Sequence, residues 1–189
     1  IREIRASERR FYQKITDIYA ECSADYNVNS AETKTFFATV QNKLHWAITR
    51  ETAAEIVYHR ANHTQPNMGL TSWKNAPDGK IRKSDVSIAK NYLNEEELGS
   101  LNRIVTMYLD YAEDQAKRRK VMYMSDWVEK LNAFLQFNER EILDNPGKVT
   151  HEIAQAFAES EFEKYRIVQD KLYQSDFDKL LEQTKDNKP

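Results

Sequence analysis

Apolar residues recur at helical spacing along most of the chain, and short polar stretches separate the runs. Side chains three or four positions apart lie on one face of a helix, so these runs predict amphipathic helices. The clearest run has alternating steps of three and four residues: Leu98, Leu101, Val105, Tyr108 and Ala112. Weaker runs predict helices over residues 7–22, from residue 30 onward, and over 52–62, 84–93, 125–144 and 150–172, with a short restart near 175.

Residues that cap helices stand at the start of most runs. Thr52 with Glu55, and Asn94 with Glu97, have the spacing of a capping box, in which two side chains satisfy amide groups of the first turn. Single capping residues are expected at four other starts: Ser7, Ser84, Ser125 and Thr150. The last long helix is expected to bury the apolar positions Ile153, Phe157, Tyr165, Val168 and Leu172.

The helical period fails between residues 63 and 83. This stretch holds two of the 4 prolines and two of the 4 glycines of the chain, and Asp78-Gly79 predicts the turn of a small hairpin. Irregular segments of about 20 residues are uncommon inside compact domains and are often functional. Because Met68, Leu70 and Trp73 are apolar, we expect this loop to pack against the helices.

The composition agrees with one all-α domain. The chain has 189 residues, 40% hydrophobic and 31% charged, with only 4 Gly and 4 Pro, and sheet-rich domains need more turn residues than this. We therefore predict an all-α bundle of about six to seven helices with one long irregular loop at about 63–83. The domain is expected to span residues 1–184 as the C-terminal part of a longer protein, and residues 185–189 to form a disordered tail.

Several classes of protein are disfavoured by charge and residue usage. A net charge of −2 gives no overall attraction to nucleic acid or to anionic membranes. Cys22 is the only cysteine, which excludes an internal disulfide and favours a reducing compartment. No stretch approaches the roughly 18 apolar residues of a membrane span. We expect a cytoplasmic protein that needs no cofactor and has no metal site.

The irregular loop is the best candidate for a binding site. Its polar groups, an aromatic ring and nearby cations are of the kinds that bind nucleotides or single-stranded nucleic acid. The candidate residues for binding a ligand or partner are Asn67, Thr71, Ser72, Trp73, Lys74 and Lys83. Gly69 would let the backbone approach the ligand closely. The alternative is that the apolar residues of the loop simply close the end of the bundle.

Histidine and basic residues suggest further chemistry, each with a structural alternative. His45 is a weak candidate for a general base, with Lys90 or Arg103 stabilising negative charge. A buried His45 bonded to backbone is the alternative. Glu55, His59 and His63 lie four residues apart; one helix face carrying all three could hold zinc, but a solvated face is favoured. Residues 117–120 are all basic; they either offset the dipole at a helix end or contact phosphates.

Several strings of residues resemble the RhuM family of bacterial virulence-associated proteins. They lie at residues 11–14, 16–19, 37–45, 66–73, 89–98, 126–127 and 138–143, and the string Pro-Asn-Met-Gly-Leu-Thr-Ser-Trp at 66–73 is the most specific. The resemblance covers nearly the whole chain. It implies a DNA-binding regulatory protein, whose winged or helix-turn-helix part precedes the region seen here and whose gene often lies beside restriction–modification genes.

These observations predict a non-catalytic helical module that binds or assembles with a partner. The partner would be a protein or a second copy, with nucleic acid contacted by the full-length protein and no role for a membrane. One alternative is an enzyme that acts on nucleotides or nucleic acid with His45 as base. Another is a scaffold that only forms oligomers.

Overall fold

The computed structural model describes residues 17, 20, 23–27 and 29–172. These residues form five α-helices and two short 3-10 helices, and no strand occurs among them apart from an isolated bridge between Ser23 and Met122. The elements are α2 (Ala31–Thr49), α3 (Ala53–Arg60), η1 (Pro66–Gly69), η2 (Ala89–Tyr92), α4 (Glu95–Lys117), α5 (Met124–Phe137) and α6 (His151–Leu172). The all-α prediction is confirmed.

The number of α-helices is smaller than predicted. The expected helices at 7–22 and near 175 lie wholly or mostly outside the described residues. The expected helix over 84–93 is wrong, because this stretch forms turns and then η2. The helix at 125–144 was predicted too long: α5 ends at Phe137, and the chain continues to α6 without regular structure.

Most predicted helix starts are confirmed by hydrogen bonds. In α3 the Glu55 carboxylate accepts from the Thr52 amide at 2.8 Å and the Thr52 hydroxyl from the Glu55 amide at 3.3 Å. The same reciprocal pair joins Asn94 and Glu97 before α4.

The remaining starts rest on single side chains. Ser30 caps α2, and the Thr150 hydroxyl accepts from the Ile153 amide in the first turn of α6. Ser125 is not the cap of α5, which begins one residue earlier. The carboxylate of Asp126 accepts from the Tyr123 amide instead.

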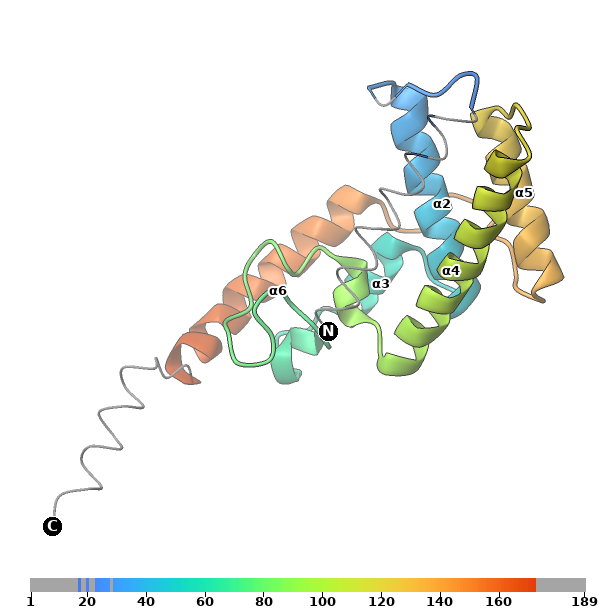
Figure 1. Ribbon diagram of the computed structural model, residues 1–189. Coiled ribbons are helices and arrows are strands. Elements are labelled where there is room, and N and C mark those ends of the chain that lie inside the picture. Colours follow the sequence, from blue (N-terminus) through green and yellow to red (C-terminus); the bar gives the residue numbers. More distant parts are fainter. Residues whose placement is uncertain (1–16, 18–19, 21–22, 28, 173–189) are drawn as a thin grey trace, which may run out of the picture.

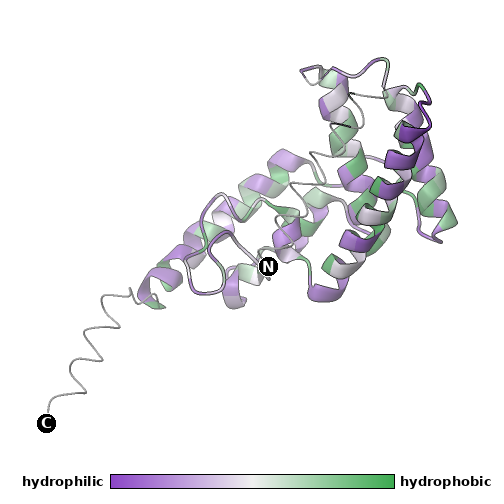
Figure 2. Cartoon of the chain, viewed as in Figure 1, coloured by the Kyte–Doolittle hydropathy of each residue, from purple (hydrophilic) through white to green (hydrophobic). Residues whose placement is uncertain are grey.

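The helices form two packed groups (Figure 1). At one end α2 packs against α4 and α5, and toward the other end α3 packs against α6. Trp127, Tyr108 and Leu131 are fully buried in the first group, and Ile56 is fully buried on α3. Figure 2 shows hydrophobic and hydrophilic segments alternating along α4 and α5, as expected for helices with one buried face.

The buried face of α6 agrees only in part with the predicted one: Phe157 and Tyr165 pack against the core as expected. Its buried residues are Ala154, Ala158, Glu161 and Phe162. Ile153, Val168 and Leu172 were expected in the core but are 53%, 46% and 75% exposed. Ala154 and Ala158 are buried although their side chains are small, and the ring of Phe157 on α6 lies 4.7 Å from that of Tyr58 on α3.

Residues 61–94, which we call the crossover, run from α3 to α4 over the core. The predicted hairpin at Asp78-Gly79 is wrong, since the segment consists of turns. The prediction that this loop packs against the helices is confirmed: Met68, Leu70 and Trp73 are at most 6% exposed.

Candidate functional site

Asp85 organises the middle of the crossover from a buried position. Its two carboxylate oxygens accept from the backbone amides of Lys74 at 3.1 Å and Arg82 at 2.9 Å. Its own carbonyl oxygen accepts from the Asn91 side chain at 2.8 Å. Asp85 is 3% exposed, so its charge is satisfied by N–H groups rather than by water. One residue, through its side chain and its backbone carbonyl, therefore joins three parts of the irregular backbone.

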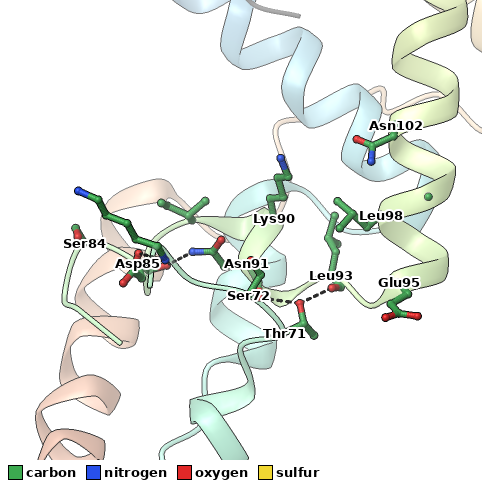
Figure 3. A pocket seen from close by; sticks show the side chains of 13 residues that line it. Thr71, Ser72, Ser84, Asp85, Lys90, Asn91, Leu93, Glu95, Leu98 and Asn102 are labelled. Atoms are coloured by element: carbon green, nitrogen blue, oxygen red, sulfur yellow. Dashed lines mark hydrogen bonds between the residues drawn. The ribbon is translucent and has the colours of Figure 1, made fainter. Parts of the chain in front are cut away.

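Thr71 and Ser72, in the first half of the crossover, are hydrogen-bonded to residues near its end (Figure 3). Their amides donate to the Asn91 carbonyl oxygen at 2.7 and 3.2 Å. The Thr71 hydroxyl lies 2.5 Å from the Leu93 carbonyl oxygen and 3.0 Å from that of Asn91. These bonds hold residues 71–72 beside the entrance to α4.

A pocket of about 740 Å³ opens between residues 71–93 of the crossover and the first turns of α4. We call it the α4 pocket. It is lined by Thr71, Ser72, Lys74, Ser84, Asp85, Ile88, Lys90, Asn91, Leu93, Glu95, Leu98, Gly99 and Asn102. In Figure 3 Leu98 and Asn102 come from α4, and Ser84 and Asp85 from the crossover. Its size lies within the range of roughly 300–1,000 Å³ that is typical of ligand sites.

Gly99 gives the α4 pocket an unusual wall. It lies inside a helix, where glycine costs about 1 kcal/mol relative to alanine. A Cβ atom added there would meet nothing within 4 Å among the described residues, so no packing contact in that part of the chain requires the glycine. The backbone of α4 is therefore bare toward the pocket. The sequence shows a glycine between Leu98 and Leu101 within the strongest helical run, and this signal was overlooked.

Gly69 has a different role from the predicted one. Its φ angle is +81°, and a Cβ atom there would lie 2.3 Å from the Arg60 carbonyl oxygen. The close approach that requires this glycine is to the end of α3 and not to a ligand. The neighbouring Asn67 is exposed with a φ of 52°, so it serves the same tight turn.

The structure divides the predicted binding residues into two groups. Thr71, Ser72 and Lys74 line the α4 pocket, whereas Asn67 and Lys83 do not. Lys83 instead lies 3.0 Å from Glu159 on α6.

Trp73 is 6% exposed, and its indole N–H donates to the Gly79 carbonyl oxygen. Its prediction as a stacking anchor is corrected, because a buried ring cannot receive a base or a partner's side chain.

The predicted catalytic group is not brought together. His45 is 5% exposed, and its Nδ1 lies 2.8 Å from the Gln41 carbonyl oxygen one turn earlier on α2. Lys90 lines the α4 pocket, but His45 and Arg103 are not among its described lining residues, and Arg103 lies at the surface of α4. The buried, backbone-bonded His45 corresponds to the structural alternative.

Glu55, His59 and His63 serve three separate contacts. Glu55 is buried and accepts from the amides of Thr52 and Lys148. His59 lies 2.6 Å from Glu51. His63 lies beyond the end of α3. In the part of the chain that the structure describes, no group of three or more potential metal ligands occurs.

His63 is bonded to Glu161, which connects the crossover with α6. The carboxylate accepts from the His63 amide, the His63 ring and the Lys164 ammonium. Burial raises the pKa of Glu161, but these hydrogen bonds outweigh burial and bring its pKa down to about 2. Glu161 is therefore charged over the whole physiological range.

Arg60, the last residue of α3, contacts residues at the start of α4. Its guanidinium lies 2.7 Å from Glu97 and 3.0 Å from Glu51, and it donates to the Tyr92 carbonyl oxygen. The hydrogen bond to Glu97 raises the pKa of Arg60 despite partial burial, and the same bond lowers the pKa of Glu97. This two-carboxylate contact fixes α3 relative to α4.

The basic run at 117–120 only partly caps a helix. Lys117 is the last residue of α4, Arg118 is its C-cap and Arg119 has a φ of 52°. Only Lys117 therefore lies in the last turn, where the helix dipole acts most strongly. Lys117 and Arg118 lie 3.6 and 3.9 Å from Glu113 and Asp114.

Fold and pocket together define a class: an α-helical protein whose irregular crossover forms a ligand-sized pocket with one helix. Residues 1–174 match the model of the virulence protein RhuM family. The chain belongs to that family, as the resemblance predicted. No curated protein matches the chain, and neither does any solved structure. No helix in the described part has the length and apolarity needed to span a membrane.

Proposed function

We propose that the chain is a non-catalytic binding and assembly module of this family. Its α4 pocket would receive an apolar side chain of a protein partner. The observation that supports this most directly is Gly99, a helix-interior glycine that lines the pocket and that no contact between described residues requires. A side chain from outside could pack directly on the helix backbone there.

The remaining lining suits such a partner. Ile88, Leu93 and Leu98 supply apolar contact area, which drives most protein association. Ser72 and Asn102 lie among them and offer hydrogen-bonding groups to the partner's backbone. An apolar centre with a polar surround is the usual composition of a binding site.

The lining residues give little support for catalysis. None of those described is His or Cys, so the hydroxyl groups of Thr71, Ser72 and Ser84 have no imidazole beside them among the described lining residues to activate them as nucleophiles. Of the two carboxylates, Asp85 already accepts from two backbone amides. His45, the base of the alternative hypothesis, is buried on α2.

Gly99→Leu provides the test, because it fills the pocket without harming the helix. Leucine favours a helix over glycine by about 0.8 kcal/mol, so the variant should unfold at equal or higher urea concentration. We expect it to lose the partner. A photo-crosslinking amino acid at Ser72, in cells that make the intact protein, should capture a partner that Gly99→Leu no longer captures.

A matched control adds the same side chain elsewhere. Ala156 is exposed on α6, so Ala156→Leu changes surface hydrophobicity without touching the pocket. It should leave the crosslink at Ser72 unchanged. The proposal fails if no crosslink forms at Ser72, or if the crosslink survives Gly99→Leu.

A further inference from the structure

A second depression, of about 730 Å³, lies between the crossover and α6 and is separate from the α4 pocket. We call it the basic groove. Four cations line it: Lys80, Arg82, Lys83 and Arg166. Asp170 is the one carboxylate among its described lining residues. The described lining therefore carries four positive charges against one negative charge, although the whole chain has a net charge of −2.

The backbone that carries three of these cations is held in place. The Gln169 side chain accepts from the Ile81 amide at 2.8 Å and donates to the Ile81 carbonyl oxygen at 3.1 Å. One residue later, the Arg82 amide donates to Asp85. Ile81 itself is 3% exposed and anchors the segment in the core. The cations thus project from a fixed frame, which lowers the entropy cost of binding an anion.

The ion pairs that the groove cations already form are weak enough for an anionic ligand to replace them. Lys80 lies 2.7 Å from Asp170, Lys83 lies 3.0 Å from Glu159 and Arg166 lies 3.3 Å from Glu163, and all of these side chains are at least partly exposed. Such surface pairs contribute about 0–1 kcal/mol each, so a multivalent anion can replace them. Among the described residues no carboxylate pairs with Arg82, whose side chain belongs to an exposed residue.

We propose that the basic groove binds a phosphate-bearing anion through Arg82, Arg166 and Lys80. Guanidinium groups match phosphate oxygens with two parallel hydrogen bonds, and several cations around one depression favour a ligand with more than one negative charge. Such a group belongs either to a phosphodiester strand or to a small free phosphate compound. This inference concerns a site distinct from the α4 pocket and does not depend on a protein partner.

Two probes distinguish these sources: a fluorescein-labelled oligothymidylate and inorganic pyrophosphate. Fluorescence anisotropy of the first and calorimetry of the second would be measured from low to moderate salt. We expect Arg82→Glu to weaken binding about tenfold and to lower the slope of log affinity against log salt by about one contact's share, roughly 0.7 for a single strand. Arg166→Gln should have a smaller effect in the same direction.

Lys130→Glu is the matched control, because it makes the same change in net charge at an exposed position on α5. It should change affinity by less than about twofold if binding is local. Gly99→Leu should also leave anion binding unchanged. If the oligonucleotide binds and Arg82→Glu weakens that binding, the ligand is a phosphodiester strand. If only pyrophosphate binds, and Arg82→Glu weakens that binding, the ligand is a small anion.

Two results would overturn the proposal. One is that neither probe binds to the wild-type chain. The other is that Lys130→Glu weakens binding as much as Arg82→Glu, which would mean that only overall charge matters. Arg82→Gln, which keeps a polar side chain of similar reach, guards against a folding artefact and should still weaken binding if the charge is needed.

Discussion

The crossover and the C-terminal half of α6 contrast in how backbone regularity relates to burial. The crossover is irregular over more than thirty residues, yet Met68 and Trp73 within it are buried. The last turns of α6 are regular, yet Ile167 and Leu172 are 59% and 75% exposed, and in Figure 1 this end of the helix extends away from the other helices. A regular backbone is therefore no measure of how far the apolar side chains of a segment are buried.

Hydrogen bonding explains the contrast. Helical amides are satisfied within the helix, so α6 can extend beyond its neighbours without leaving polar groups unpaired. An irregular segment has lost these bonds and must find others. In the crossover they come from the Asn91 carbonyl oxygen and the Asp85 carboxylate. The acceptors lie more than ten residues after the amides of Thr71, Ser72 and Lys74 that donate to them. Forming these hydrogen bonds therefore folds the crossover onto itself.

The largest effect that would test this contrast is expected at Trp73. Trp73→Ala removes a buried indole and its bond to Gly79 and should lower the free energy of unfolding by about 3–5 kcal/mol. Urea unfolding followed by circular dichroism would measure it. Leu172→Ala, at an exposed position of α6, should change stability by less than about 0.5 kcal/mol. Equal losses of unfolding free energy in Trp73→Ala and Leu172→Ala would contradict the contrast between the crossover and the end of α6.

A second, smaller effect is expected from two glycines that differ in surroundings. Gly69→Ala forces an alanine to a φ of +81° and against the Arg60 carbonyl oxygen, and should destabilise the fold by about 2–4 kcal/mol. Gly99→Ala meets open space inside a helix and should stabilise it by about 0.5–1 kcal/mol. Thermal and urea unfolding of both variants would give the signs. A destabilising Gly99→Ala would show that the pocket wall serves the fold.

The third prediction concerns Glu161, which joins the two regions. Its folded pKa of about 2 lies below the ordinary value of 4.5, so the folded state binds protons less readily. The stabilisation is complete above about pH 4.5 and is lost as the pH falls toward 2. Glu161→Gln should therefore cost about 2 kcal/mol at pH 7, and this difference from wild type should shrink on acidification.

Urea unfolding at several pH values between neutral and acidic would measure that difference. Lys164→Ala is a useful companion, because it removes one donor to Glu161 and leaves the His63 bonds in place. It should give a smaller loss with the same dependence on pH. A difference that stays constant with pH would show that the Glu161 charge does not matter for the link between crossover and helix.

Local signals in the sequence predicted much of the frame. The capping pairs Thr52–Glu55 and Asn94–Glu97 depend on residues three apart, so they were found before any tertiary contact was known. The start of α5 was missed, because its N-cap is Tyr123, and the Asp126 carboxylate in the first turn bonds back to the Tyr123 amide. The buried face of α6 was predicted only in part, because Ala154 and Ala158 are buried on it and small alanines carry little weight in a hydrophobic pattern.

The candidate site was predicted only in part. Thr71, Ser72 and Lys74 were selected as polar groups in an unusual loop, and the structure places them around the α4 pocket. Trp73 was predicted to bind a ligand through its aromatic ring, but it is buried. An aromatic ring suits a binding surface and a core equally well, so the sequence does not distinguish the two. Gly99, which forms the opposite wall of that pocket, lies almost thirty residues away in the sequence.

By itself, the sequence determined the helical class, most helix starts, the presence of an irregular segment after α3 and membership of the RhuM family. These properties depend on spacing, capping and composition within short stretches. Only the tertiary structure decided which side chains are buried, which face of α6 packs on α3, and that a pocket forms where the crossover meets α4. Those outcomes depend on contacts between residues far apart in the chain, where a small side chain or one bonded carboxylate outweighs local preference.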